Sequence, residues 1–230
     1  MKRGARPKEN VSIAWSPDFA YAIGLIVADG CVSKDGRHIN FTSKDKELIM
    51  HFCTSLRLKL QVKEKKSGAG KVSYYVQFSD VSFHKYLSTI GVYPAKSLTI
   101  SGVNIPKKYF IDFFRGYFDG DGSVYSYRDT IYENSSRLYI SFTSGSVQYI
   151  DWLRDSLSKF YGVRGYISKN KNNKYVQLKF AKRESLLLCD LMYYKKDVLA
   201  LSRKYKKAMS AIKNIKSRSG EIGRRATFRA

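Results

Sequence analysis

Two segments of the chain, residues 22–30 and 114–122, share one pattern: an apolar run with small residues spaced four apart that ends in Asp-Gly. They read AIGLIVADG and FRGYFDGDG, with Gly24 and Gly116 at the same place in each. Positions i and i+4 share one face of a helix, so each segment predicts a helix with a stripe of small residues. Glycine inside a helix costs about 1 kcal/mol relative to alanine. We therefore expect the two stripes to face each other, where close approach of two backbones requires glycine.

The pattern that follows each segment also repeats, and it predicts the order helix, two strands, helix, two strands, helix, twice over. The paired elements fall at 39–43 and 140–144, 47–56 and 149–157, 61–64 and 166–169, and 73–78 and 174–180. A repeat unit of this length indicates a duplicated subdomain, since solenoid units recur more often. The predicted organisation is a flexible basic N-terminus (1–12), two subdomains (13–104 and 105–214), and a flexible basic tail (215–230).

The strands alternate apolar and polar residues, as in Ile39 and Phe41 with Asn40 and Thr42 between and after them. A period of two predicts sheets with one face buried under helices and one face open. Polar and aromatic side chains on an open face can contact base edges and phosphates, although a merely solvated face is the other interpretation. The predicted DNA-contacting residues are Arg37, Asn40, Thr42, Lys63, Lys65, Lys71, Tyr75, Gln77, Tyr125, Tyr127, Arg137, Tyr139, Ser141, Thr143, Lys169, Lys171, Gln177 and Lys179.

The charge balance favours nucleic acid as the partner. The formal net charge is +23, with 42 lysines and arginines against 19 acidic residues. Such a surplus repels itself in a compact protein unless a polyanion neutralises it. No apolar stretch approaches the roughly 18 residues that span a bilayer, and no secretory signal follows the N-terminus, so we expect an intracellular protein without membrane contact. The three cysteines and three histidines lack the spacing of a disulfide framework or a zinc site.

Asp29 and Asp121 end the two predicted helices, where the negative end of the helix dipole disfavours an anion. Two aspartates that converge there require a cation, and Mg²⁺ is bound by one or two carboxylates together with phosphate and water. Asp-Gly is also a frequent turn dipeptide, so one motif alone would indicate little more than a helix end. Two motifs at corresponding repeat positions favour a shared metal site.

These two segments resemble the paired motifs of the LAGLIDADG homing endonucleases, and the surrounding order of strands and helices extends the resemblance from about residue 12 to about residue 212. The resemblance implies an α+β fold in which two pseudo-symmetric αββαββα subdomains form a saddle of antiparallel sheets over duplex DNA. It also implies Mg²⁺-dependent cleavage of both strands, with Asp29 and Asp121 as metal ligands. Val27 stands where the family pattern has its first aspartate, a position that its catalysis does not need.

The resemblance further implies a lysine from each half beside the scissile phosphates. Lys96 and Lys204 fall at the matching places, although either could be an ordinary surface lysine, and Arg203 competes for the second role. A lysine there would stabilise charge on the phosphate or hold the attacking water. The backbone carbonyls of Ala28 and Gly120 are expected to reach the metals as well.

The main hypothesis is a monomeric, site-specific double-strand DNA endonuclease with an internal pseudo-two-fold axis. Because the halves differ in sequence, its target is expected to be long and only pseudo-symmetric. Two alternatives stay open: an RNA-binding maturase that assists splicing of its host intron, and a catalytically silent DNA-binding regulator. The intact aspartates favour the nuclease.

Overall fold

The computed structural model describes residues 9–68, 70–128, 136–169 and 175–227. The N-terminal half contains α1 (Pro17–Asp29), β1 (Gly30–Val32), β2 (His38–Ser43), α2 (Lys46–Ser55), β3 (Lys63–Lys66), β4 (Val72–Ser79), α3 (Val81–Thr89) and the short α4 (Lys96–Thr99). A 3₁₀ turn (Lys107–Tyr109) leads into the C-terminal half, which contains α5 (Phe110–Asp121), β5 (Ser123–Arg128), β6 (Ser136–Ser144), α6 (Val147–Tyr161), β7 (Tyr166–Lys169), β8 (Val176–Phe180), α7 (Lys182–Met192) and α8 (Ser202–Thr227).

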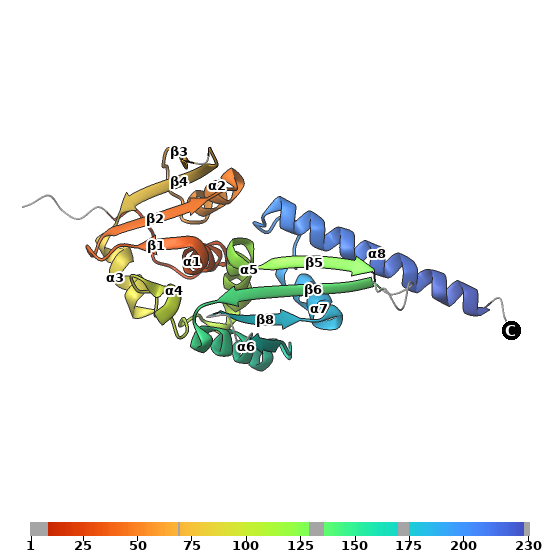
Figure 1. Cartoon of the computed structure of the whole chain (residues 1–230). Coiled ribbons are helices and arrows are strands. Elements are labelled where there is room, and N and C mark those ends of the chain that lie inside the picture. The colour runs from red at the N-terminus through yellow and green to blue at the C-terminus, as the bar shows by residue number, and fades with distance from the viewer. Residues whose placement is uncertain (1–8, 69, 129–135, 170–174, 228–230) are drawn as a thin grey trace, which may run out of the picture.

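The two halves share one topology. Each forms a four-stranded antiparallel sheet, with strand order β1-β2-β4-β3 in one and β5-β6-β8-β7 in the other. The sheets lie on either side of the paired helices α1 and α5 (Figure 1). This arrangement confirms the predicted α+β architecture of two pseudo-symmetric αββαββα subdomains with the motif helices at their interface.

Helix α1 begins where its sequence predicts. The Ser16 hydroxyl accepts a hydrogen bond from the Phe19 amide at 3.1 Å, and Pro17 needs no amide partner in the first turn. Within α1 and α5 the backbones touch at the glycines. A Cβ on Gly24 would lie 2.1 Å from the Phe113 carbonyl oxygen, and one on Gly116 would lie 2.0 Å from the Tyr21 carbonyl oxygen. The two small-residue stripes therefore face each other, as predicted.

The strand register separates a core face from an open face in each sheet. In the first sheet Ile39 pairs with Phe78 and Phe41 with Val76, and all four side chains are buried. The second sheet repeats this with buried pairs at the equivalent places of β6 and β8. Helices cover these apolar faces, so the polar residues between them line the opposite faces.

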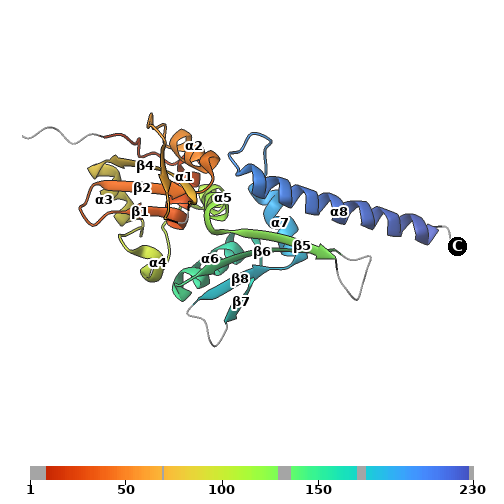
Figure 2. The ribbon, with the colours of Figure 1, turned by 45° about the horizontal axis from the view of Figure 1, so that its top comes forward.

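The C-terminal segment differs from its prediction. Residues up to Thr227 continue helix α8 instead of forming a tail without regular structure, and the helix extends beyond the strands (Figures 1 and 2). Its first part buries Ala208, Ala211, Ile212 and Ile215. Once these side chains pack, each further residue of the helix adds a hydrogen bond without a new nucleation step.

The N-terminal segment is anchored where the structure describes it. The amides of Asn10 and Val11 donate to the carboxylate of Asp80 at 2.7 and 3.0 Å, and Val11 is buried. Residues 1–8 of the predicted flexible N-terminus lie outside the described residues. None of the helices in the described ranges has the length and hydropathy that a membrane span requires.

Candidate functional site

The packing of α1 against α5 brings the C-terminal ends of both helices together. Asp29 is the last residue of α1, and Asp121 is the last residue of α5. The Asp29 carboxylate lies beside the other helix, because a Cβ on Gly120 would be 3.4 Å from Asp29 Oδ2 and 2.3 Å from the Cβ of Ala28. The absence of a side chain at Gly120 thus lets the two helix ends approach.

The two aspartates destabilise each other's charge. Loss of hydration and, after it, the nearby charge of Asp29 raise the pKa of Asp121 to about 6, although Lys204 and Lys96 oppose the change. Loss of hydration also raises the pKa of Asp29, while Lys204 and Lys96 oppose that change. Both side chains keep contact with solvent. A pair of carboxylates at two negative helix ends is therefore suited to a bound cation.

The predicted lysines both reach these helix ends. Lys96 is buried, and its Nζ donates to the carbonyl of Gly30, next to Asp29. Lys204 is also buried, and its Nζ donates at 2.6–2.9 Å to three carbonyls at the end of α5, those of Phe118, Asp119 and Gly120. Burial lowers the pKa of Lys204 to about 8 and lowers that of Lys96. The structure thus brings together the four residues for which the sequence predicts a catalytic role.

Arg203, the other candidate for the role predicted for Lys204, is engaged in an ion pair. Arg203 forms a two-pronged ion pair with Asp45 of the N-terminal half, with hydrogen bonds of 2.8 to 3.1 Å. Its guanidinium therefore points to the other subdomain, and Lys204 alone of the two contacts the end of α5.

Hydrogen bonds to Asp119 and Glu47 hold the start of α8 in place. The Leu201 amide donates to Asp119 Oδ2 at 2.8 Å, and the same oxygen accepts from the Tyr21 hydroxyl at 2.7 Å. The amide and hydroxyl of Ser202 donate to Glu47 of the N-terminal half. Both subdomains thus position the turn that carries Lys204. Asp119 could have been found as the extra acid of the second motif, whereas no sequence signal pointed to Glu47.

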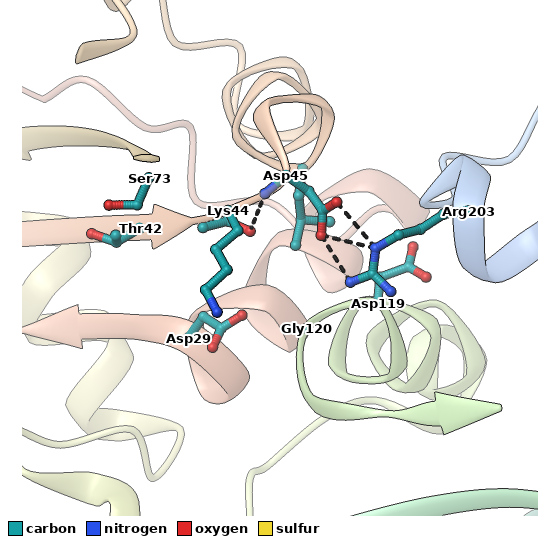
Figure 3. A pocket seen from close by; sticks show the side chains of 10 residues that line it. Asp29, Thr42, Lys44, Asp45, Ser73, Asp119, Gly120 and Arg203 are labelled. Atoms are coloured by element: carbon teal, nitrogen blue, oxygen red, sulfur yellow. Dashed lines mark hydrogen bonds and ion pairs between the residues drawn. The ribbon is translucent and has the colours of Figure 1, made fainter. Parts of the chain in front are cut away.

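A cavity of about 370 Å³ opens beside Asp29 at the junction of the two halves. It is lined by Asp29, Thr42, Ser43, Lys44, Asp45, Leu48, Ser73, Asp119, Gly120 and Arg203. Lys44 extends from the end of β2 toward Asp29, and Asp45 meets Arg203 across the cavity (Figure 3). No sequence pattern marks Lys44, because one lysine among many carries no signal of its own.

The open sheet faces carry most of the predicted contact residues. Register places Asn40 opposite Gln77 and Thr42 opposite Tyr75, which in turn faces Lys63. In the second sheet the same face carries Tyr125, Tyr127, Arg137, Tyr139, Ser141, Thr143, Gln177 and Lys179. Three of these tyrosines form a stacked row, with ring centroids of Tyr125 and Tyr127 at 5.2 and 6.1 Å from that of Tyr139. Arg37 and Lys71 are exposed at the strand connections, and Lys65 pairs with Ser73.

Three of the predicted DNA-contacting residues are not among those that the structure shows exposed on an open sheet face. Lys169 pairs with the buried Val176 and so belongs to the core side of its edge strand, because register, which the sequence alone does not give, decides the face. Ser141 is on the open face but only 3% exposed, at the middle of the sheet. Lys171 lies outside the described residues. The open faces also include residues that were not predicted to contact DNA, namely Cys31, Ser73, Ser123, Tyr166 and Ser168.

The donor set at the helix ends fits a hard divalent cation. Two carboxylates and nearby backbone carbonyls are oxygen ligands of the kind that Mg²⁺ prefers. In the part of the chain that the structure describes, no group of three or more His, Cys, Asp or Glu side chains could hold a metal. A cation bound between Asp29 and Asp121 would therefore need further oxygen ligands from phosphate or water.

Comparison with known proteins identifies the family. The LAGLIDADG-like domain matches residues 16–91 and 111–203, one stretch in each half. The match falls in both halves, in agreement with the duplicated fold and the paired motif helices. The chain therefore belongs to the LAGLIDADG family.

Relatives of known name share this fold at low sequence identity. The homing endonuclease I-WcaI, bound to its DNA recognition sequence, superposes with a TM-score of 0.60 at 15% identity and covers 86% of this chain and 88% of that one. I-LtrWI, bound to target DNA, gives 0.60 at 11% identity, covering 87% and 91%. Full-length DUF199/WhiA of Thermatoga maritima gives 0.54 at 16% identity, covering 95% and 70%. These likenesses show the fold alone.

One protein with a similar sequence is much longer than this chain. The DNA-directed RNA polymerase subunit Rpo1C of Methanocaldococcus jannaschii is 28% identical over 160 residues. The match covers 67% of this chain and only 17% of the length of that subunit.

Proposed function

We propose that this protein is a divalent-metal-dependent, site-specific endonuclease that cleaves both strands of duplex DNA. The observation that carries the proposal is the convergence of Asp29 and Asp121 at one point, each beside a buried lysine. A structural role gives no reason to place two mutually repelling carboxylates at two helix ends. A metal site for phosphodiester hydrolysis does.

In this proposal Asp29 and Asp121, with the carbonyls of Ala28 and Gly120, hold Mg²⁺. When bound, the metal would lower the pKa of a water ligand and offset the negative charge that builds up on the phosphate. The Gly120 carbonyl also accepts a hydrogen bond from Lys204 at 2.9 Å, so this lysine and the metal would share one acceptor.

The protein's own groups position the substrate and stabilise charge. Lys96 and Lys204 are fixed at the helix ends by hydrogen bonds, so their positive charges are already in place to stabilise negative charge on a phosphate bound there. Hydrolysis forms one bond from water oxygen to phosphorus and breaks one from phosphorus to a sugar oxygen. The water loses a proton, and the released sugar oxygen gains one.

The open sheet faces are the proposed DNA-binding surface. The net charge of +23 and the row of stacked tyrosines suit a polyanion with base edges. I-WcaI and I-LtrWI, which share the fold, are bound to DNA, and I-DmoI has been studied in complex with DNA and Ca. Since the two faces differ in sequence, we propose a monomer that acts inside the cell on a long target of two unlike half-sites.

The test begins with selection of cleaved sequences from a genomic or random library in the presence of Mg²⁺. A plasmid with the selected site is then cut by the wild type and by Asp29→Asn and Asp121→Asn. We expect both variants to bind the site and to leave it uncut, and chelation of the metal to stop the wild type. Undiminished cutting by either variant would contradict the proposed roles.

Two other functions remain outcomes of the same test. DUF199/WhiA shares this fold, and its name does not describe a nuclease. The fold alone therefore does not establish nuclease activity. A silent DNA-binding regulator would bind one sequence tightly and yield no products with any divalent metal. An intron maturase would promote splicing even without both aspartates; no observation on the described residues favours it.

A further inference from the structure

Helix α8 exposes a polar and basic side that none of the contacts described above uses. The side turned to the protein buries Ala208, Ala211, Ile212 and Ile215. At 3.6 residues per turn the exposed positions fall on the opposite side of the helix. These exposed residues, called here the α8 basic face, are Lys206, Lys207, Ser210, Lys213, Asn214 and Ser217. Each carries a side chain that can donate a hydrogen bond to a phosphate oxygen.

The charge of the α8 basic face is not balanced within the protein. From Ser202 to Gly220 the sequence has no acidic residue and seven basic ones, namely Arg203, Lys204, Lys206, Lys207, Lys213, Lys216 and Arg218. Lys206, Lys207 and Lys213 form no ion pair with any residue that the structure describes. Like charges three or four residues apart on a helix repel each other, and cations near its first turn oppose the helix dipole. Helix stability therefore gives no reason for this sequence, whereas a bound polyanion does.

Helix α8 also lies beside the proposed DNA-binding surface. It contacts β5, runs along that strand from the junction of the two halves, and continues past the end of the strand (Figures 1 and 2). A cavity of about 450 Å³ between them is lined by Tyr125 of the open sheet face and by Arg203 and Lys207 of the helix. The α8 basic face thus adjoins the open face of the second sheet at Lys207 and leads away from it.

The N-terminal half has no equivalent surface in the part of the chain that the structure describes. Lys96 begins the four-residue helix α4, whereas the matching Lys204 lies near the start of the 26-residue helix α8. Residues 97–106, which follow Lys96, carry no charged side chain. A basic helix beside the sheet is therefore a feature of one end of the molecule.

The length of the α8 basic face matches a short stretch of duplex. A rise of 1.5 Å per residue gives roughly 17 Å from Lys206 to Ser217, which is the length of about five base pairs. Lysine contacts to phosphate oxygens carry no sequence information. The open sheet face would therefore read the half-site, and the helix would hold the backbone of the duplex that continues beyond it.

We infer that the α8 basic face binds the phosphate backbone of the DNA that flanks the half-site of the C-terminal subdomain. The inference rests on the proposed function, because it extends the same DNA-binding surface. The contacts are electrostatic, so they add affinity that salt weakens and add no base specificity. Only one of the two flanks is bound in this way, since only one half carries the helix.

The test measures binding of the full chain over a range of salt concentrations, in chelator so that the DNA stays uncut. The probes are the selected site trimmed to the shortest duplex that is cut, and the same duplex lengthened at one end or at the other. The wild type is expected to bind one lengthened duplex about tenfold more tightly than the trimmed one, and the other no more tightly.

The variant that removes the charge is Lys206→Gln with Lys207→Gln and Lys213→Gln. It should lose the gain from lengthening, and the steepness of log affinity against log salt on that duplex should fall by about 0.9 for each lysine removed. Lys213→Gln alone should lower the steepness by about 0.9, and arginine at all three positions should keep the gain. With Mg²⁺ and saturating protein, the triple glutamine variant should cut the trimmed site at the wild-type rate.

Lys85→Gln with Lys159→Gln is the matched control. These lysines are exposed on α3 and α6, which pack against the apolar sides of the sheets, and their loss should change neither the gain nor the steepness. An unchanged steepness in the triple variant and in Lys213→Gln, or an equal gain from lengthening either end, would overturn the inference and leave the nuclease proposal standing. So would a loss seen only with RNA of the same sequence. Flank binding that depends on the three lysines, without cutting of any duplex by the wild type, would support the inference and refute the nuclease proposal alone.

Discussion

The close contact between α1 and α5 makes Gly24→Ala the most informative single substitution. The added Cβ would lie 2.1 Å from the Phe113 carbonyl oxygen and 2.6 Å from the Tyr117 amide nitrogen. Both neighbours are backbone atoms of α5, so neither can move as a flexible side chain would. The helices must separate by roughly 1.3 Å to restore an ordinary contact of 3.4 Å.

Two opposing effects set the magnitude. Alanine favours a helix over glycine by about 1 kcal/mol. Overpacking of a buried contact costs about 1–3 kcal/mol, and more where backbone must shift. Because the clash is with backbone on both sides, we expect the upper end of that range and a net loss of at least about 2 kcal/mol in the free energy of unfolding.

The assay is urea denaturation of the purified full chain, followed by circular dichroism. Gly68→Ala is the matched control, because a Cβ at Gly68 meets nothing within 4 Å. It is expected to stay within about 0.5 kcal/mol of the wild type. Cutting of the selected site should also fall in Gly24→Ala, since the separation displaces Asp29 from Asp121.

An unchanged midpoint and slope for Gly24→Ala would refute the proposed close packing. A stability gain near the helix-propensity value would be still stronger contrary evidence, since it would mean that α1 has free space at Gly24. Loss of cutting with full stability would refute the predicted stability cost in the same way.

Three further predictions concern charged groups at the interface. Asp121→Asn in chelator should raise the free energy of unfolding at pH 8 by about 1 kcal/mol after allowance for solvent screening, because the pKa of Asp121 is raised from 3.8 to about 6 and its ionised form is disfavoured. The gain should shrink as the pH falls through this range and disappear below about pH 3, where the carboxyl is protonated in both states; a gain that persists there would contradict the cause. Arg115→Met should cost about 3–5 kcal/mol by denaturation, because it removes the cation 2.9 Å from the buried Asp112 carboxylate, whose hydrogen bond from the Tyr194 hydroxyl at 3.0 Å does not neutralise its charge; Asp112→Asn added to it should recover part of the loss. Lys204→Met should reduce cutting of the selected site at least about tenfold while site binding in a gel-shift assay stays within about twofold; equal loss of both would indicate a structural role instead.

The fold was largely predictable because its patterns are local. A period near 3.6 residues in the motif segments and a period of two in the strands predicted the order of elements in both halves, which the structure confirms. The tail was not predictable in this way. Residues 215–227 lack an apolar period of their own, and they extend α8 because Ala208, Ile212 and Ile215 pack its first part.

Within the site, the sequence determined that Asp29 and Asp121 end two helices with small-residue stripes, since both facts are written in consecutive residues. Only the tertiary structure decided which side chains join them. Lys44 and Asp45 are far from Arg203 in the chain, and no local pattern predicts that these two segments meet. Strand register likewise decided that Lys169 leaves the open face, because a shift of one residue reverses the side on which every side chain lies.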